Sequence, residues 1–500
     1  MKRVAAVLAA LAVGAGVLTG TGVAGAETLS RFYEQDVEWT ACGDAALDQA
    51  GAQCAEVTVP LDYAEPRSRT IKVAISRLKA TDTEHRRGAM LSNPGGPGGE
   101  GLHFMLYIRG AMSPEVTSRC DLIGMDPRGV GRSEAIDCAW PIGHMLWSAG
   151  LDRGDFLDSV RTQADLARRC ARKEGDRIAH ITTRNTARDM DIIRGALGET
   201  KLSYFGMSYG TYIGAVFTQM FPRRSDRIVL DSAIDPAAYM AGSIRNSAPL
   251  NEAALDDWAD WTAARDAEYH LGATGKQVRA RVEDLIEQSA RSPIRIGEHL
   301  LDERFLPMTL FTLLPDARYN PYLAGRVRQI ADAAAGKAIQ PSKDFDDELR
   351  FMLKGQPRDL SSQAAVICGD AAVPRDPEWY WRNIQHSRAD QPVFGPYANN
   401  ITACAFWAPP REPRTIVRND VPALIVQATR DTRTVYQEGV NLHRAMSASR
   451  LVTLQDVRMH GIFGRLPNIC VENAVNTYFG DGTLPAADIT CHSPLSSRAK

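Results

Sequence analysis

The sequence predicts an α/β protein with a mostly parallel central sheet flanked by helices, into which a mainly helical cap domain is inserted. Three observations support this fold class. Short β-like runs alternate with helical stretches, a pattern typical of a parallel sheet covered by helices. A long helix-rich block interrupts the alternation, and β-like runs resume after it. At 500 residues, the chain is also longer than one compact domain usually is.

The β-like runs are short stretches rich in β-branched and apolar residues. They are 71–78, 89–93, 122–125, 202–206, 227–231, 423–427 and 450–455. Between them, residues 186–197 space Met190, Ile193 and Leu197 along one face of a helix. Residues 209–221 predict a second helix that leaves a tight turn.

The helix-rich block covers residues 237–416 and differs in composition from the rest of the chain. It is rich in aromatic residues and scattered prolines, and β-like runs nearly vanish from it. A separate globular domain is the alternative, but the β-like runs that follow carry residues that the chemistry needs. We therefore expect residues 27–236 and 417–500 to form one core domain and residues 237–416 to form its cap.

The first 26 residues have the layout of a secretory signal peptide. Lys2 and Arg3 give a positive start, an apolar run covers residues 4–18, and small residues precede an expected cleavage after Ala26. A membrane anchor is the alternative, but the run is shorter than the about 20 residues that a span needs. We expect a secreted protein without a membrane anchor.

The charge balance is nearly even, with 58 Lys and Arg against 60 Asp and Glu. This balance offers no basic stripe of the kind that nucleic-acid binders carry. We expect a peptide or small-molecule substrate, no nucleic acid, no cofactor and a monomeric protein.

Nine cysteines occur in the chain. In an exported protein, we expect them to form disulfides. Outside the cytoplasm, cysteine pairs form durable disulfides, and metal binding is the weaker alternative because no Cys-x-x-Cys spacing occurs. The odd count leaves at least one thiol free. Cys120 is our candidate because it begins an apolar run, where a buried thiol serves as a small hydrophobic side chain.

The strongest local signal for chemistry is Gly206-Met207-Ser208-Tyr209-Gly210, between a β-like run and a helix-like one. This Gly-x-Ser-x-Gly elbow is typical of α/β-hydrolases, in which a strained turn exposes the serine hydroxyl. The helix that starts after it adds partial positive charge near a developing oxyanion. The pattern predicts Ser208 as a nucleophile.

A serine nucleophile needs a histidine base, which follows the serine and an acid in this fold. His460 directly follows the β-like run 450–455, where the last strand would end over the serine. His386 lies within the cap block, His443 in a helix-like stretch and His492 in a polar tail. We therefore predict His460 as the base.

The acid that orients the histidine is expected at the end of the preceding strand. Asp431 follows the run 423–427, although a turn residue is its alternative interpretation. Asp456 ends the histidine's own strand, and Asp420 precedes a strand and so lies at the opposite edge of the sheet. We predict Asp431.

An oxyanion hole is predicted in the glycine-rich segment Asn93 to Gly99. Glycines let the backbone approach the substrate, so the amide of Gly96 can act together with the amide of Tyr209. A plain loop or a phosphate cradle is the alternative, but no Lys-Ser/Thr follows as in a nucleotide loop. A nearby segment, DPRGVGRS, is interpreted as a structural turn in which Asp126 and Arg128 pair.

Together these motifs resemble the secreted tripeptidyl aminopeptidases of actinomycetes, a branch of the prolyl-aminopeptidase-like serine peptidases with the α/β-hydrolase fold. The resemblance covers about residues 42–491 and rests on NPGGPGGEG, DLIGMDPRGVGRS, NTARDMDIIRGALG, GMSYGTYIGA, PALIVQATRD and MHG. It implies the triad Ser208, Asp431 and His460. It also implies four disulfides, Cys42 with Cys54, Cys138 with Cys170, Cys368 with Cys404, and Cys470 with Cys491.

Two positions depart from the family pattern. Members often have Gly-Ser before the histidine and a proline shortly after the acid. This chain has Arg458 and Met459 before His460, and Arg433 two residues after Asp431. Neither departure removes a catalytic group, but both arginines change the charge expected around the site.

An aminopeptidase must bind the α-ammonium of its substrate, for which acidic side chains are suitable partners. Glu252 stands in the first cap helix, where the resembling enzymes also have a glutamate, and a solvated helix charge is its alternative. Asp370, after Cys368, is a second candidate.

The resemblance implies an exopeptidase that releases short peptides, tripeptides in this family, from free N-termini through an acyl-enzyme. A secreted carboxylesterase or lipase would use the same triad and is the main alternative. A non-catalytic binding protein on this fold is disfavoured by the intact triad. Epoxide hydrolases and dehalogenases are disfavoured because they carry aspartate at the elbow.

Overall fold

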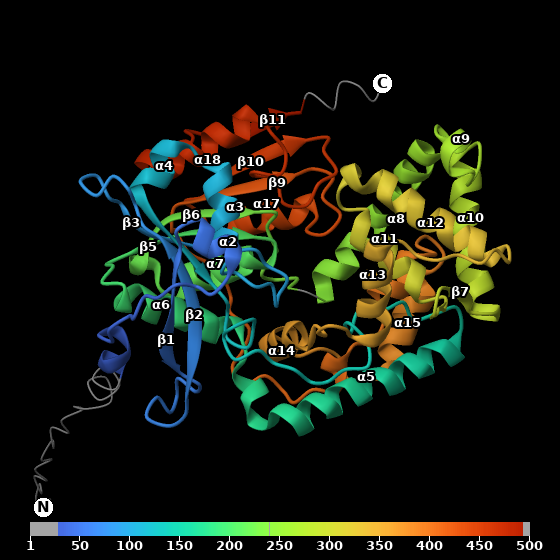
Figure 1. Ribbon diagram of the computed structural model, residues 1–500, viewed down its shortest axis with the longest axis horizontal. Coiled ribbons are helices and arrows are strands. Elements are labelled where there is room, and N and C mark those ends of the chain that lie inside the picture. The colour runs from blue at the N-terminus through green and yellow to red at the C-terminus, as the bar shows by residue number, and fades with distance from the viewer. Residues whose placement is uncertain (1–28, 240, 494–500) are drawn as a thin grey trace, which may run out of the picture.

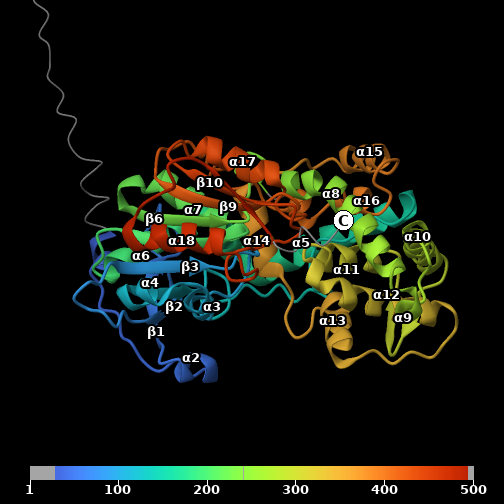
Figure 2. The ribbon, with the colours of Figure 1, turned by 90° about the horizontal axis from the view of Figure 1, so that it is seen from above.

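The computed structural model describes residues 29–239 and 241–493, so the expected signal peptide over residues 1–26 lies outside the described residues. The chain forms a lobe built around a sheet and a mainly helical lobe beside it, and two perpendicular views show both (Figures 1 and 2).

A nine-stranded sheet forms the centre of the first lobe, in the order β1-β2-β4-β3-β5-β6-β9-β10-β11. The β1–β2 and β2–β4 pairs are antiparallel, and all other neighbouring strands are parallel. The strands are β1 (Gln53–Pro60), β2 (Thr70–Leu78), β3 (Gly88–Asn93), β4 (Cys120–Met125), β5 (Leu202–Met207), β6 (Ser225–Asp231), β9 (Ala423–Ala428), β10 (Arg450–Gln455) and β11 (Ile489–His492). The predicted α/β class is therefore confirmed.

Every β-like run found in the sequence lies in one of these strands, whereas β1 and β11 were not predicted. Both unpredicted strands lie at the edges of the sheet. β1 mixes buried and partly exposed residues, and β11 has 4 residues, so neither carries a continuous apolar run. By contrast, β5 and β9 are buried at every residue, as central parallel strands covered on both faces should be.

Helices cover both faces of the sheet, and each face has its own apolar cluster. One cluster joins the sheet to α6 (Thr183–Ala196), α7 (Tyr209–Met220) and α17 (Tyr436–Ala445). The other joins it to α3 (Phe104–Ala111), α4 (Pro114–Arg119) and α18 (Ile469–Asp481), with Leu47 of α2 (Ala45–Gln49). The predicted helices over 186–197 and 209–221 correspond to α6 and α7.

The second lobe packs around a separate apolar cluster that includes Trp258, Phe305 and Phe345. Its helices are α8 (Ala241–Ala263), α9 (Asp266–Tyr269), α10 (Gly275–Arg291), α11 (Phe305–Leu313), α12 (Asn320–Ala334), α13 (Lys343–Lys354), α15 (Pro377–Ser387) and α16 (Phe394–Ala398). A two-stranded antiparallel sheet of β7 (Ile294–Ile296) and β8 (His299–Leu301) accompanies them. The lobe therefore has a core of its own.

Two helices cross the expected boundary between core and cap. α5 (Arg153–Glu174) belongs to the stretch expected in the core, yet Phe156 packs with Tyr380 and Ile384 of α15. Figure 1 shows α5 along the lower edge of the molecule, where it spans the two lobes. Conversely, α14 (Ser361–Asp370) lies in the stretch expected in the cap, but its apolar residues join the sheet lobe's cluster.

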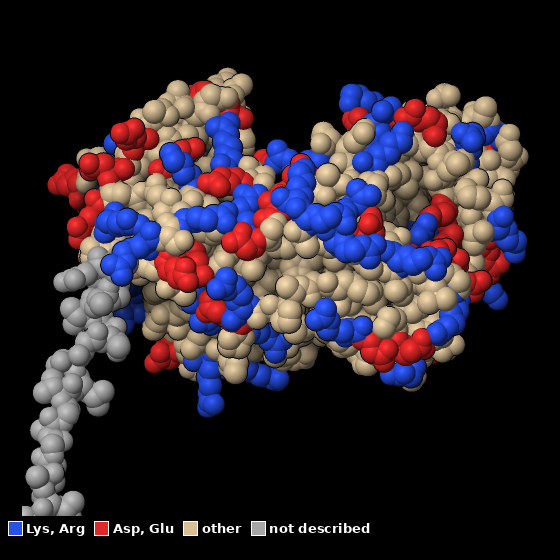
Figure 3. All heavy atoms as spheres, turned by 90° about the horizontal axis from the view of Figure 1, so that it is seen from below, with Lys and Arg blue, Asp and Glu red and all other residues tan. Residues whose placement is uncertain are grey.

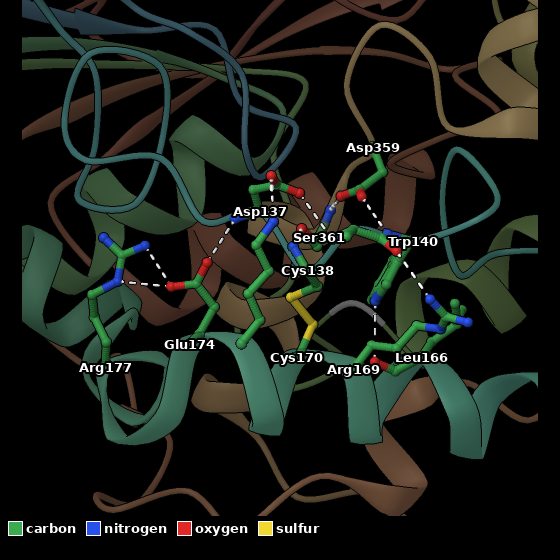
Figure 4. The surroundings of a disulfide bond; sticks show 12 residues. Asp137, Cys138, Trp140, Leu166, Arg169, Cys170, Glu174, Arg177, Asp359 and Ser361 are labelled. Atoms are coloured by element: carbon green, nitrogen blue, oxygen red, sulfur yellow. Dashed lines mark hydrogen bonds and ion pairs between the residues drawn. A yellow bond between two sulfur atoms is a disulfide. The ribbon is translucent and has the colours of Figure 1, made fainter.

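The C-terminal end of α5 is held by the disulfide Cys138–Cys170 (Figure 4). The amide of Cys138 donates to Ser361 Oγ at 3.0 Å. Two residues further on, the amide of Trp140 donates to Asp359 Oδ2 at 2.7 Å. The disulfide and these two bonds join α5, the segment after β4 and the start of α14.

Charged side chains of both signs cover the surface, in line with the even charge balance. On the face drawn in Figure 3, Lys and Arg form a band across both lobes, and Asp and Glu lie along it. Within the described ranges, no helix is both long and apolar enough to cross a membrane.

Candidate active site

Ser208 occupies the turn between β5 and α7, with φ 57° and ψ −125°. The neighbouring glycines are required by space. A Cβ on Gly206 would lie 2.4 Å from the carbonyl oxygen of Gly210, and one on Gly210 would lie 2.6 Å from that of Asn93. The strained turn leaves Ser208 partly exposed at the carboxyl end of a central strand.

His460 follows β10 and lies beside the carboxylate of Asp431, with Nδ1 of the histidine 2.9 Å from Oδ2 of the aspartate. Asp431 is fully buried, whereas 17% of the His460 side chain is exposed. This contact orients the ring and leaves its Nε2 edge for a substrate or a serine hydroxyl. The two residues lie 29 positions apart in the chain, and the ends of β9 and β10 bring them together.

The carboxylate of Asp431 is fixed by three more donors. Oδ1 accepts from the amides of Arg433 at 2.8 Å and Thr434 at 3.2 Å, and Oδ2 accepts from the Thr434 hydroxyl at 2.9 Å. Hydrogen bonds to the charged form of a carboxylate stabilise its negative charge. Asp431 is therefore well placed to hold an imidazolium at His460.

Ser208 and His460 line one cavity of about 370 Å³, together with Gly96. Gly95 has φ +94°, and a Cβ there would lie 2.5 Å from the carbonyl oxygen of Met207 and 2.9 Å from the amide nitrogen of Tyr209. The glycine-rich loop thus rests directly on the serine turn. The first amides of a helix have no partner inside the helix, so Tyr209 and the loop can offer donors at this point.

Asp370 lies behind the serine turn and not in the cavity. Its carboxylate accepts from the amide of Thr183 at 2.7 Å and from the hydroxyls of Thr183 and Tyr239. The Thr183 hydroxyl also lies 2.6 Å from that of Tyr209. Burial raises the pKa of Asp370 to about 6. These hydrogen bonds fix Asp370 to the residues that support the elbow, and its role as an ammonium partner stays a prediction.

Glu252 also lies away from the cavity. One of its oxygens accepts from the amides of Val393 and Phe394 at 2.9 and 2.8 Å, and the other pairs with Arg279. It joins α8 to the start of α16 and to α10. The two acids expected to bind a substrate amine are therefore both engaged in contacts inside the protein.

The arginines that depart from the family pattern have different places. Arg433 lines the cavity with Ser208, as does Arg465. Arg458 is buried and donates to Asn320 Oδ1 at 2.8 Å and to the Leu314 carbonyl, so it joins the end of β10 to the helical lobe.

The expected pairing of Asp126 with Arg128 was wrong. Arg128 is fully buried, and its Nε donates to Asp189 Oδ2 at 2.7 Å. Asp126 Oδ1 instead accepts from the amides of Gly101 and Leu102, at 2.7 and 3.2 Å. With the amide of Arg132, three backbone amides donate to the buried carboxylate of Asp126. Both groups therefore have partners without pairing with each other: Asp126 has the amides, and Arg128 has Asp189.

Asp231, the last residue of β6, supports the site, and sequence patterns did not single it out. It lies under the loop that follows His460, and burial raises its pKa to about 6. A carboxylate at the carboxyl end of a parallel strand was the available signal, because sites gather at that edge of such sheets.

The structure contains the disulfides Cys42–Cys54, Cys138–Cys170, Cys368–Cys404 and Cys470–Cys491, which are the pairs that the resemblance implied. Cys120 is free and buried, and burial raises the pKa of its thiol to about 11. Within the part of the chain that the structure describes, no group of three or more His, Cys, Asp or Glu side chains could hold a metal ion.

Fold and site together define an enzyme of the serine-hydrolase class with the α/β-hydrolase fold. The family described as "TAP-like protein" matches residues 391–491. The tripeptidyl aminopeptidase of Streptomyces lividans is 35% identical over 485 residues, which cover 92% of this chain and 88% of that protein. The chain therefore belongs to the family of the tripeptidyl aminopeptidases.

Two other relatives come from Mycobacterium tuberculosis. The serine protease Hip1 is 28% identical over 497 residues, covering 91% of each chain. Carboxylesterase B is 30% identical over 480 residues, covering 91% of this chain and 89% of that protein.

Proposed function

We propose that this protein is an exported serine exopeptidase that releases tripeptides from the free N-termini of peptides, with Ser208, His460 and Asp431 as its triad. The observation that carries the proposal is the 2.9 Å contact between Asp431 and His460, because His460 lines the same cavity as Ser208. A serine, a histidine and a buried acid in this arrangement are the machinery of acyl transfer.

In this mechanism His460 takes the proton of Ser208 as the hydroxyl attacks the carbonyl of the third residue of the substrate. The amides of Gly96 and Tyr209 hold the negative charge that develops on the carbonyl oxygen. Asp431 stabilises the imidazolium form of His460 through Nδ1. His460 then gives its proton to the leaving amine, and a new peptide N-terminus departs.

The acyl-enzyme is removed by water in the reverse sequence. His460 takes a proton from the water as it attacks the ester carbon, the same two amides hold the oxyanion, and the tripeptide leaves with a new carboxylate as Ser208 regains its proton. Each step uses groups that this chain supplies.

The length of the released piece is proposed from the relative in Streptomyces lividans, which is named as a tripeptidyl aminopeptidase. A second cavity of about 270 Å³ adjoins the first, since Leu146 and Ile244 line both. It extends along the start of α8 and could hold the N-terminal residues of a bound peptide.

Export is proposed from the four disulfides, since such bonds persist outside the cytoplasm. The layout of residues 1–26 as a signal peptide agrees with this location.

A carboxylesterase is the second candidate function, favoured by the similarity to a protein named carboxylesterase B. The same triad cleaves esters, so the distinction lies in how the cavity receives the substrate. Amide cleavage that depends on a free amine would favour the exopeptidase.

The test is a panel of chromogenic peptide amides of increasing length, each with a free and a blocked N-terminus, beside a short-chain ester. We expect the free tripeptide amide to be cleaved fastest. The exopeptidase proposal fails if blocking the amine leaves amide cleavage unchanged, or if only the ester is cleaved. Ser208→Ala should remove turnover of every substrate, and full activity in that variant would refute the triad.

A further inference from the structure

Arg433 places a cation in the cavity of Ser208. Its amide donates to Asp431 Oδ1 at 2.8 Å, which fixes the start of the side chain two residues from the proposed acid. The guanidinium carbon lies 3.7 Å from the centre of the Phe311 ring. Phe311 belongs to α11 of the helical lobe. The side chain is partly buried and lines the cavity together with Ser208 and His460.

The guanidinium of Arg433 is unpaired. Over residues 29–239 and 241–493, the structure contains no hydrogen bond and no ion pair to it. The other two arginines described at the site have polar partners. Arg458 donates to Asn320 at 2.8 Å, and Arg465 pairs with Asp316 at 3.1 Å. Burial lowers the pKa of Arg433 to about 10, so the group still carries its charge at neutral pH.

The stacking on Phe311 explains how the side chain is held but not what its donors bind. Contact with an aromatic ring uses the flat face of a guanidinium. The N–H groups lie in the plane of the guanidinium and remain free to bind two oxygens of a carboxylate side by side. Removing a cation from water without an anionic partner costs free energy, which favours a partner that arrives with the substrate.

The rest of the cavity supplies no such partner. Among the described residues that line it are Arg433 and Arg465 but no Asp or Glu. Ser243, Gln363 and Thr434 add neutral polar groups. The carboxylates of Asp431 and Asp231 are committed to His460 and to the loop after it, and Asp316 pairs with Arg465. A substrate therefore meets the unpaired guanidinium of Arg433 in the cavity that Ser208 lines.

We infer that Arg433 is a specificity-determining residue that binds a carboxylate of the peptide close to the scissile bond. The substrate class is thus peptides with an acidic side chain at the cleavage site or with a C-terminal carboxylate on a short leaving group. Both sources present the same bidentate acceptor to the guanidinium. The inference rests on the proposed peptidase function and names its preferred substrates.

The experiment compares kcat/KM for two matched pairs of substrates. The first pair is the p-nitroanilides of Ala-Ala-Glu and Ala-Ala-Gln, which differ by a carboxylate on the acyl side. The second pair is tetra-alanine and its C-terminal amide, which differ by a carboxylate on the leaving side. We expect kcat/KM to be about 10-fold higher for the substrate with the extra carboxylate in at least one pair. That pair shows whether the carboxylate that Arg433 binds lies on the acyl side or on the leaving side.

Arg433→Gln should reduce this preference to about 1, whereas Arg433→Lys should retain part of it because the charge remains. The matched control is Arg430→Gln, which removes the same charge three residues away, where the side chain pairs with Asp257 and does not line the cavity. It should keep the wild-type preference. A ratio of two kcat/KM values does not depend on the folded fraction, so partial misfolding does not obscure the result.

Equal rates within both pairs for the wild type overturn the inference, as does a preference that survives in Arg433→Gln. If Arg433→Gln does not fold, the test rests on the wild-type preference and on its partial retention in Arg433→Lys. If only esters are cleaved, the proposed peptidase function fails, and the 4-nitrophenyl esters of Ala-Ala-Glu and Ala-Ala-Gln then test the carboxylate preference on its own.

Discussion

The carboxylate of Asp231 holds the loop that positions His460. Its Oδ2 accepts from the backbone amides of Ile462 at 2.9 Å and Phe463 at 2.8 Å, two and three residues after the histidine. Asp231 itself ends β6, the strand beside β5 and its serine turn. One buried side chain thus joins the strand next to the nucleophile to the loop of the base.

Asp231→Ala should therefore impair both activity and stability. Two buried amides would lose their acceptor, which costs about 3 kcal/mol of unfolding free energy, and a displaced His460 should lower kcat by about 100-fold. Denaturant unfolding and steady-state kinetics measure the two effects. Asp226→Ala, in the same strand with a partly exposed side chain, is the control and should change neither strongly. Normal kcat in Asp231→Ala would contradict the positioning role.

Gly95→Ala should disturb the oxyanion site while every proposed catalytic side chain keeps its identity. The new Cβ would lie 2.5 Å from the Met207 carbonyl oxygen and 2.9 Å from Ser208 Cβ, so loop or turn must move. We expect kcat to fall by about 100-fold, since a shift of about 1 Å at the reacting groups has that effect. Gly43→Ala is the matched control, because Gly43 also has positive φ but no atom within 4 Å of the new Cβ. Equal losses in both variants would attribute the effect to backbone strain alone.

Glu438 on α17 predicts a pH dependence of stability. Its Oε2 accepts from the Ser243 hydroxyl and at 3.2 Å from the amide of Asp235, whereas Oε1 is buried without a partner in the described chain. Burial raises the pKa of Glu438 from 4.5 to about 7. The unfolded chain loses this proton near pH 4.5 but the folded chain keeps it, so the stabilisation is present below pH 4.5 and is lost as pH rises through 7.

Glu438→Gln cannot ionise and should lose less stability than the wild type between pH 5 and pH 8. The measurement is the denaturant midpoint at several pH values. Glu283→Gln, which removes a partly exposed carboxylate of α10 paired with Arg279, should follow the wild-type profile. If the denaturant midpoint of Glu438→Gln changes with pH as that of the wild type does, the carboxyl of Glu438 has the same pKa in the folded and the unfolded chain, which contradicts the prediction.

Loss of the disulfide between α5 and the segment after β4 should weaken the join between the lobes. Cys138→Ser with Cys170→Ser opens a loop with a sequence separation of 32, which corresponds to about 4 kcal/mol of unfolding free energy. The same change at Cys42 and Cys54, with a separation of 12, corresponds to about 3 kcal/mol. Unfolding under non-reducing conditions should show this order, and the reverse order would contradict an effect through the unfolded chain.

Much of the site could be predicted because its signals are local. The elbow around Ser208 is a five-residue pattern, and Asp431 and His460 each follow a buried strand within a few residues. In a parallel sheet the carboxyl ends of neighbouring strands share one edge, so chain order was enough to place them together. The edge strands β1 and β11 lacked a continuous apolar run, and the helices α5 and α14 show no sign in sequence of which lobe they join.

The sequence by itself determined the α/β class, the order of the strands along the chain and the candidates Ser208, Asp431 and His460. The reason is that a buried central strand and a strained glycine turn each depend on a few residues that are adjacent in the sequence. Only the tertiary structure decided which charges have partners. Glu252 and Asp370 are satisfied by amides and hydroxyls from distant segments, whereas Arg433 is left facing the cavity. The pairing of a buried charge depends on which segments pack around it, and that is a property of the folded chain.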